Sequence, residues 1–284
     1  MRKEAVAAMY HESFKFSDAD LDFLVASAAP EIRDTQRLRQ ILEEDEDFRN
    51  AFIGDEKTFQ KVMSYHEIFL KISPKLYFEI LLRRAHRELR TLGHTVERSG
   101  TQKIAVFDTG EVVDLLSRSA VLVYLADMLS SFTRIESYAV SFRSEKGIWR
   151  KIRFNDLDVD SLTRFSQHVD EQYRLAFFKR IADICLFMLG IFADYIQYTY
   201  RYPHSGELRP SLVRQMRRST EEYEEKGKKF YKLAANHPFA KDLEISELFW
   251  LFHGSFHTAQ KPLRHIAQNY LHNVRGKLFG LNVP

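Results

Sequence analysis

The sequence predicts a mainly α-helical protein, a multi-helix bundle with a long central helix and one inserted β-hairpin. Glycine and proline are scarce, at 11 and 7 of 284 residues, whereas all-β sandwiches and barrels need many turns that consume them. Apolar residues recur at steps of three and four between Ser161 and Tyr202, which is the period of a helix with one buried stripe. Apolar alternation, the signature of a half-buried strand, is convincing only at 137–155.

The central helix is expected to span Ser161 to Tyr202. Every residue from Ile184 to Ala193 is apolar or glycine, so neighbouring helices must cover this segment on all sides. The predicted core residues are Ile184, Phe187, Met188, Ile191 and Phe192. Since Asp183 and Asp194 close the run and a membrane span needs about 20 apolar residues, we expect no membrane span.

Asp183 and Asp194 are eleven residues apart, almost three helical turns, which places both carboxylates on one face of a continuous helix. They are candidates for a pair of partly buried acids or metal ligands. The alternative, which we favour, is that each pairs with an Arg or Tyr of an adjacent helix, because buried charges are normally paired.

The chain is expected to form a single predominantly helical domain over residues 1–284, with a possible subdomain break near 203–210 where Pro203, Gly206 and Pro210 interrupt the pattern. Its single cysteine, Cys185, excludes an intramolecular disulfide and is predicted to be a buried hydrophobe. The apolar stretch near the N-terminus is too short for a signal peptide. We therefore expect a cytoplasmic protein.

Capping and stop signals predict the remaining elements. The expected helices are one capped by Ser17 and ending near Pro30, one from Arg33 to Phe52 that includes the acidic run Glu43–Asp47, one from Ser73-Pro74 to Gly93, one from a capping box at Asp108 and Glu111 to Phe132, one from Ser219 to Asn236, and one from Ile245 to Gln260. Pro262 is expected to kink or restart this last helix, and Leu263 to Phe279 to form a further amphipathic helix. Between the third and fourth helices we expect a polar loop, Glu97 to Gln102, and a short β-prone segment.

The net charge of +3 is too small to indicate a nucleic-acid binder by itself, but basic residues gather at Arg83–Arg90, Arg143–Arg153 and Arg214–Lys232. From the first two clusters we predict contact sites for an anionic partner, at Arg83, Arg87, Arg90, Arg150, Lys151 and Arg153. The alternative for the first site is a solvated face with ordinary Arg–Glu pairs, since Glu79 lies four residues before Arg83. The stretch Lys226–Lys229 is predicted to be solvated surface.

A winged helix-turn-helix has the same order of helix, strand, helical stretch and basic hairpin. A recognition helix needs polar side chains to reach base edges. The candidate helix, Ala120 to Ala126, is nearly all apolar. It is predicted to be core instead.

No common cofactor or nucleophile signature occurs. The one metal-like spacing is His253-x-x-x-His257, which would present two imidazoles on one helix face to a divalent ion such as zinc. A third ligand would have to come from a packed helix, and Gly254 stands where zincins have their glutamate. The alternative, which we favour, is that both rings make ordinary hydrogen bonds beside Trp250 and Phe256.

These observations predict a cytoplasmic, non-enzymatic binding or regulatory protein. Its basic helix and hairpin faces would contact an anionic partner, either a protein or a nucleic acid. The alternative is a metal-dependent helical enzyme that uses His253 and His257.

Overall fold

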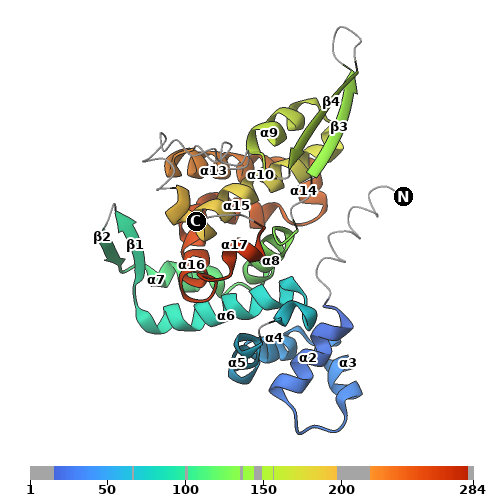
Figure 1. The fold of residues 1–284 in the computed structure, drawn as a ribbon, viewed down its shortest axis with the longest axis vertical. Coiled ribbons are helices and arrows are strands. Elements are labelled where there is room, and N and C mark those ends of the chain that lie inside the picture. The colour runs from blue at the N-terminus through green and yellow to red at the C-terminus, as the bar shows by residue number, and fades with distance from the viewer. Residues whose placement is uncertain are drawn as a thin grey trace. The chain divides into compact units, whose positions relative to one another are not determined.

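The computed structural model describes residues 16–65, 67–99, 102–134, 137–143, 149–155, 157–196 and 218–280, with the backbone alone at 96–99, 102–103, 137–143 and 149–155. The protein is mainly helical, as predicted (Figure 1). No helix within these ranges is long and apolar enough to cross a membrane. The chain divides into two compact units, Met1–Ser131 and Phe132–Pro284. The predicted break near 203–210 lies outside the described residues.

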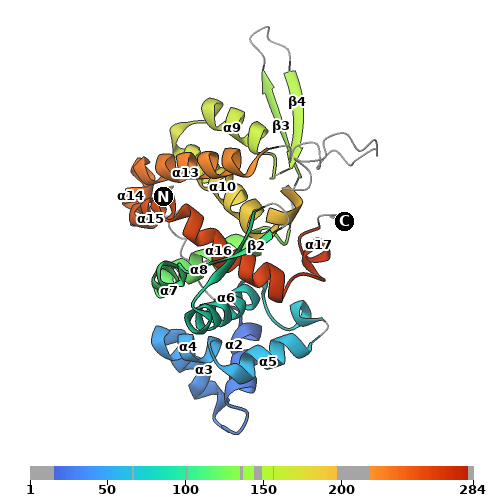
Figure 2. The ribbon, with the colours of Figure 1, turned by 90° about the vertical axis from the view of Figure 1, so that its left-hand side faces the viewer.

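The first unit contains helices and one two-stranded ribbon. Its described elements are α2 (Asp18–Ala28), α3 (Thr35–Glu44), α4 (Glu46–Ile53), α5 (Glu56–Ser64), the 3₁₀ turn η1 (Ile68–Leu70), α6 (Pro74–Leu92), β1 (Thr95–Ser99), β2 (Gln102–Val106), α7 (Thr109–Leu116) and α8 (Ser119–Ser131). Helices α2 to α5 gather near the N-terminal end of α6, and the ribbon follows its C-terminal end (Figures 1 and 2).

Helix α6 has the predicted boundaries. The hydroxyl of Ser73 accepts the backbone N–H of Leu76 at 3.2 Å, Pro74 occupies the first turn, and Gly93 ends the helix with a left-handed φ of 69°, which glycine adopts without a steric penalty. The predicted stripe is buried at Phe78, Leu81, Ala85 and Leu89. Its last predicted member, Leu92, is 51% exposed.

The predicted helix from Arg33 to Phe52 is wrong, because two helices occupy this range. Asp45 ends α3, and its carboxylate accepts the N–H of Phe48 at 3.0 Å, which caps α4. An aspartate at this position satisfies an otherwise unpaired N–H group at the helix start. The acidic run therefore lies at a helix junction.

The capping box predicted at Asp108 is also wrong. Its carboxylate accepts the hydroxyl of Thr95 at 2.8 Å and makes no cap hydrogen bond to α7. Part of the predicted polar loop is strand β1, which pairs antiparallel with β2 in the register Thr95↔Val106. The predicted helix to Phe132 is interrupted between α7 and α8. Most of the segment 120–126 is buried within α8, in agreement with its prediction as core.

The second unit contains a pair of strands followed by helices. Its described elements are β3 (Ser137–Arg143), β4 (Trp149–Asn155), α9 (Val159–His168), α10 (Glu171–Ile191), α13 (Thr220–Asn236), α14 (Pro238–Asp242), α15 (Ser246–Gly254), α16 (Phe256–Asn269) and α17 (Arg275–Leu278). Strands β3 and β4 pair antiparallel from Ser137↔Asn155 to Arg143↔Trp149. Residues 144–148 lie outside the described ranges, so the closed hairpin stays a prediction.

The prediction of a single central helix from Ser161 to Tyr202 is wrong, because the helix is interrupted between α9 and α10. Val169 and Asp170 have extended ψ values of 155° and 147°, which no helix accommodates. The turn allows α9 to pack on α10. The hydrophobic period continues across this interruption, so the sequence pattern does not predict it.

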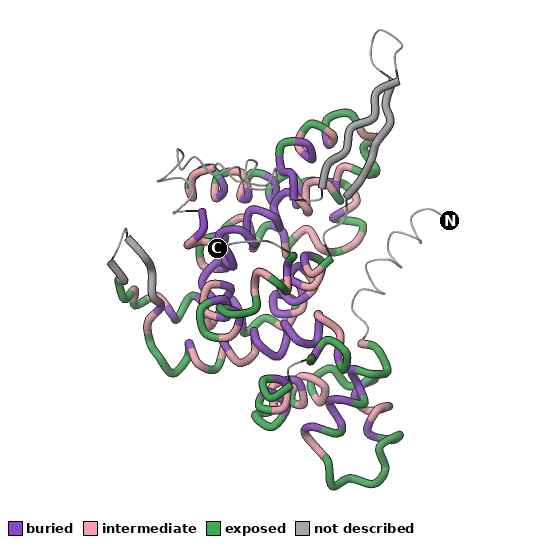
Figure 3. Tube along the Cα trace, viewed as in Figure 1, coloured by how far each residue is buried: buried purple, intermediate pink, exposed green. Residues whose placement is uncertain are grey.

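Helix α10 forms the core of the second unit. Its segment from Ile181 to Ile191 is buried throughout (Figure 3), and the five predicted core residues are each at most 1% exposed. Helices α13 and α16 pack on it. At the contact with α16, a Cβ on Gly190 would lie 2.5 Å from the Cβ of Leu263, so only glycine permits this approach.

The C-terminal helices divide at a different residue from the predicted one. The break falls at Ser255, and α16 continues through Pro262 to Asn269. Proline removes a helical hydrogen bond, but Pro262 and Leu263 are buried in the packing of the unit. Packing thus overrides the local propensity that predicted a restart.

Candidate functional site

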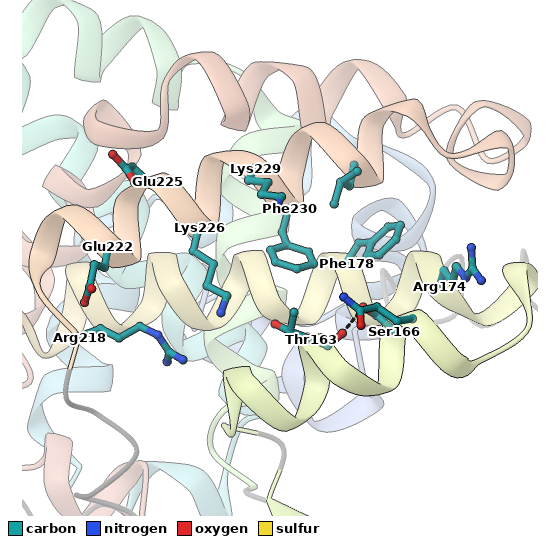
Figure 4. A pocket seen from close by; sticks show the side chains of 12 residues that line it. Thr163, Ser166, Arg174, Phe178, Arg218, Glu222, Glu225, Lys226, Lys229 and Phe230 are labelled. Atoms are coloured by element: carbon teal, nitrogen blue, oxygen red, sulfur yellow. Dashed lines mark hydrogen bonds between the residues drawn. The ribbon is translucent and has the colours of Figure 1, made fainter. Parts of the chain in front are cut away.

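A groove of about 700 Å³ opens between α9, α10 and α13 in the second unit (Figure 4). Four basic side chains line it, namely Arg174, Arg218, Lys226 and Lys229. Two acidic side chains, Glu222 and Glu225, also belong to its lining. A volume of this size is typical of ligand sites.

The start of α13 is fixed by the capping box predicted at Ser219. Its hydroxyl accepts the N–H of Glu222 at 3.1 Å, and a carboxylate oxygen of Glu222 accepts the N–H of Ser219 at 2.9 Å. From Glu222 onward, residues at steps of three and four occupy one helix face. This spacing brings Lys226 and Lys229 to the groove.

One end of the groove holds a cluster of charges from α9 and α13. Asp160, in the first turn of α9, forms an ion pair with Arg218, and the ammonium of Lys226 lies 3.5 Å from the same carboxylate oxygen. Burial tends to raise the pKa of Asp160, but the two cations outweigh it and hold the pKa below its usual value. Glu222 also lines this end of the groove (Figure 4), so its two cations lie beside two carboxylates.

The middle of the groove is apolar. The ring centroids of Phe178 and Phe230 lie 5.9 Å apart, and Phe178 also meets the His237 ring edge-on at 6.2 Å. Beside them Leu233 is 37% exposed. Figure 4 shows the two phenyl rings between Lys226 and Arg174.

Two of the four cations make no ion pair with any residue of the described ranges. Arg174 donates a hydrogen bond from Nε to the carbonyl of Val169 at 3.2 Å, which holds its side chain at the α9–α10 turn. Lys229 is exposed on α13. As far as the described ranges show, both cations can therefore bind an external anion without losing an ion pair.

The groove offers no catalytic constellation among its described residues. The described residues of its lining include neither histidine nor cysteine. The hydroxyl groups of Thr163 and Ser166 donate within α9, to the carbonyls of Val159 at 2.6 Å and Thr163 at 2.8 Å. The arrangement is suited to binding charge rather than to activating a nucleophile.

The three arginines predicted on α6 differ in their surroundings. Arg83 is only 14% exposed, and its guanidinium donates to the carboxylate of Glu79 at 2.7 Å and to the side-chain carbonyl of Asn50 at 2.5 Å, in agreement with the alternative of an ordinary Arg–Glu pair. Arg87 lies 3.9 Å from Glu56 and is exposed, as is Arg90. A contact of these two residues with an anionic partner stays a prediction.

The predicted hairpin residues lie on β4. Arg150, Lys151 and Arg153 pair with Phe142, Ser141 and Ala139 of β3. Their side chains are outside the described part of the structure. A phosphate contact by these residues therefore stays a prediction.

The two histidines of the metal hypothesis lie on different helices, because α15 ends at Gly254 and α16 begins at Phe256. The expected placement on one helix face is wrong. The Nδ1 of His253 donates to the carbonyl of Lys228 at 2.9 Å, and its ring meets Trp250 edge-on. The Nδ1 of His257 lies 3.6 Å from Glu224. Over the described residues, no three His, Cys, Asp or Glu side chains converge as metal ligands.

Asp183 is buried and paired, as the favoured alternative predicted. Lys179 lies 2.7 Å from one carboxylate oxygen, and the hydroxyl of Tyr231 donates to the other at 2.8 Å. The helix ends before Asp194, because Phe192 departs from helical geometry. The two aspartates therefore do not share one face of a continuous helix.

Sequence reasoning missed the groove, although one signal was present. Arg214–Lys232 is the third basic cluster of the chain, and it supplies three of the four groove cations. Comparisons with protein-family models, curated proteins and solved structures gave no match. The functional argument therefore rests on the geometry of the groove.

Proposed function

We propose that this protein is a binding protein and that the groove between α9, α10 and α13 receives an anionic partner. The observation that carries the proposal is the pair Arg174 and Lys229, two cations of one groove without ion pairs among the described residues. Charge of one sign in a concave site attracts a ligand of the opposite sign and speeds its association.

The groove is a better candidate than the arginine face of α6. A ligand that recruits Arg83 must displace Glu79 and Asn50 from a largely buried guanidinium, which leaves a buried carboxylate unpaired. A ligand of the groove meets Arg174 and Lys229 without that cost. The lining hydroxyl groups, already bonded within α9, support a binding role rather than a catalytic one.

The proposal is tested by titrating fluorescein-labelled polyglutamate and a labelled single-stranded oligonucleotide at low salt, where electrostatic contacts are strongest. The test variant is the double substitution Arg174→Ala, Lys229→Ala. The matched control is Arg87→Ala, Arg90→Ala, which removes the same charge from α6. Circular dichroism checks that both variants keep the helical fold.

We expect the groove variant to bind its best polyanion at least about tenfold more weakly, which corresponds to about 1.4 kcal/mol, and the α6 control to bind within about twofold of the wild type. An equal loss of affinity in the two variants would show that binding depends on net charge and not on the groove, which would contradict the proposal. No detectable binding of either probe by the wild-type protein would refute the proposal.

A further inference from the structure

The groove is elongated, and its chemistry changes along its length. From Glu222 to Leu233 the lining follows α13 for about 16 Å, at 1.5 Å per residue. Figure 4 shows Arg218 and Lys226 toward one end, the two phenyl rings in the middle and Arg174 toward the other end. An occupant that uses the whole groove thus needs negative charge at both ends and an apolar group between them.

The apolar middle distinguishes the groove from a purely electrostatic surface. Leu233 is 37% exposed beside Phe178 and Phe230. Covering this side chain removes apolar surface from water, which favours binding. An inserted aromatic side chain would also meet the exposed part of Phe178 at the offset or edge-on geometry that ring pairs prefer.

We infer, on the basis of the proposed function, that the groove takes a short acidic peptide segment with one large apolar side chain between its acidic residues. A length of about 16 Å corresponds to about five residues of extended peptide, at 3.3 Å each. Acidic residues on the two sides of the apolar one face Arg174 in one direction and Arg218 and Lys226 in the other, with Lys229 beside Phe230 (Figure 4). The apolar side chain lies on Phe178 and Leu233.

The charges of the groove favour this occupant over a nucleic acid. Three carboxylates, those of Asp160, Glu222 and Glu225, lie in or beside the lining. A continuous run of phosphates would meet them at close range along the whole groove. A protein that binds through the phosphate backbone can make about six to ten phosphate contacts, and the described lining has four cations.

The length of the groove favours a peptide over a small anion. A phosphate or a single carboxylate is satisfied at one end and leaves the apolar middle uncovered. The inference therefore makes a distinct prediction, that affinity depends on the apolar side chain and the flanking charges together.

The test measures fluorescence anisotropy with four labelled pentapeptides of defined sequence at low salt. The first is Glu-Glu-Phe-Glu-Glu, the second replaces Phe by Ala, the third replaces every Glu by Gln, and the fourth replaces every Glu by Lys. Polyglutamate, a single-stranded oligonucleotide and inorganic phosphate serve as competitors. The protein variants are Leu233→Ala, in the groove, and Leu92→Ala, an equally truncated exposed leucine of α6.

We expect the first peptide to bind at least about tenfold more tightly than each of the others, since one well-covered aromatic anchor and a set of ion pairs each contribute about that factor or more. The Leu233→Ala variant should bind the first peptide about threefold to tenfold more weakly than the wild type and should bind the alanine peptide with unchanged affinity. Leu92→Ala should change neither affinity.

The remaining outcomes separate the inference from the proposed function. Equal binding of the phenylalanine and alanine peptides, both weakened by the Arg174→Ala, Lys229→Ala variant, would leave an anion-binding groove and overturn the peptide inference. Tighter binding of the oligonucleotide, or displacement by millimolar phosphate alone, would overturn it as well. Failure of every anionic probe to bind would overturn both proposals.

Discussion

Gly227 lies where α13 packs closely against Phe256 and Cys185 in the core of the second unit. A Cβ at this position would lie 2.2 Å from Cζ of Phe256 and 3.0 Å from Cβ of Cys185. Phe256 is fully buried, so its ring has no solvent space to move into. The absence of a side chain at Gly227 therefore permits the close approach of α13 to Phe256 of α16 and Cys185 of α10.

We predict that Gly227→Ala lowers the free energy of unfolding although alanine is the better helix former. Overpacking of a filled core costs about 1–3 kcal/mol, against a helix-propensity gain of about 1 kcal/mol. The control is Gly254→Ala, where an added Cβ meets nothing within 4 Å; it should be neutral or stabilising. Urea denaturation followed by circular dichroism measures the free energy of unfolding of both variants. A Gly227→Ala protein more stable than the wild type would contradict the close contact between α13 and Phe256.

Cys185 gives a second residue-scale prediction. Its side chain is fully buried, and burial raises the pKa of the thiol to about 12. The thiolate is the reactive form, and the buried thiol is not accessible to solvent. Reaction with a disulfide reagent at pH 8 therefore requires local or global unfolding of the unit. We expect the native protein to react at least about a hundredfold more slowly than the urea-unfolded protein. Reaction at a similar rate in both states would contradict the burial of α10.

At the scale of elements, Asp160 connects α9 to α13 through Arg218 and Lys226. Its folded-state pKa is depressed, since the two cations outweigh the effect of burial. An acid of this kind stabilises the fold fully above its ordinary pKa, and the contribution is lost as the pH falls through the lowered value.

The corresponding prediction concerns Asp160→Asn, which removes the charge at nearly constant volume. The variant should be less stable than the wild type at pH 6, by at most about 1 kcal/mol because the carboxylate is largely exposed. This difference should vanish as the pH falls well below 4 and should shrink in high salt. Thermal unfolding across pH measures it, with Asp114→Asn, on the exposed surface of α7, as control. A difference that grows toward acid pH would contradict the ion-pair geometry.

Helix boundaries were predictable where the signal is local. Ser73 with Gly93 and the Ser219 capping box place α6 and the start of α13 correctly, because each is a property of adjacent residues. The breaks at Val169–Asp170 and Ser255 were missed because the apolar period continues across them. The break at Asp45 was missed because the acidic run was assigned to one helix with its flanks. A single residue that leaves helical geometry does not interrupt a pattern read over 11 to 18 residues.

The candidate site was less predictable than the fold. Arg174 and Lys229 are 55 positions apart in the sequence and reach one groove only because α9 folds back on α10 and α13 packs beside them. The helical spacing of Arg83, Arg87 and Arg90 could be recognised in the sequence. The hydrogen bond from Arg83 to Asn50 could not, because the fold brings these two residues together. A count of basic residues cannot distinguish a cation held in an internal pair from one that faces a groove.

On the scale of the whole molecule, the net charge of +3 does not show that basic side chains have different surroundings in the two units. In the first unit Arg83, Arg84 and Arg87 of α6 lie in ion pairs with glutamates, and Arg90 is exposed. In the second unit a groove has cations at both ends of an apolar middle. We therefore propose the second unit as the site of the anionic partner.

Lysine footprinting tests this assignment most directly, because it locates the bound partner on the unmodified protein. The protein is acetylated with and without saturating Glu-Glu-Phe-Glu-Glu peptide, and the rate at each lysine is measured by mass spectrometry. We predict that Lys226 and Lys229 react at least about threefold more slowly with the peptide bound, as expected for ammonium groups held by carboxylates, while the exposed Lys57 of α5 keeps its rate. Unchanged rates at Lys226 and Lys229 under saturating peptide, with protection elsewhere, would contradict the central claim.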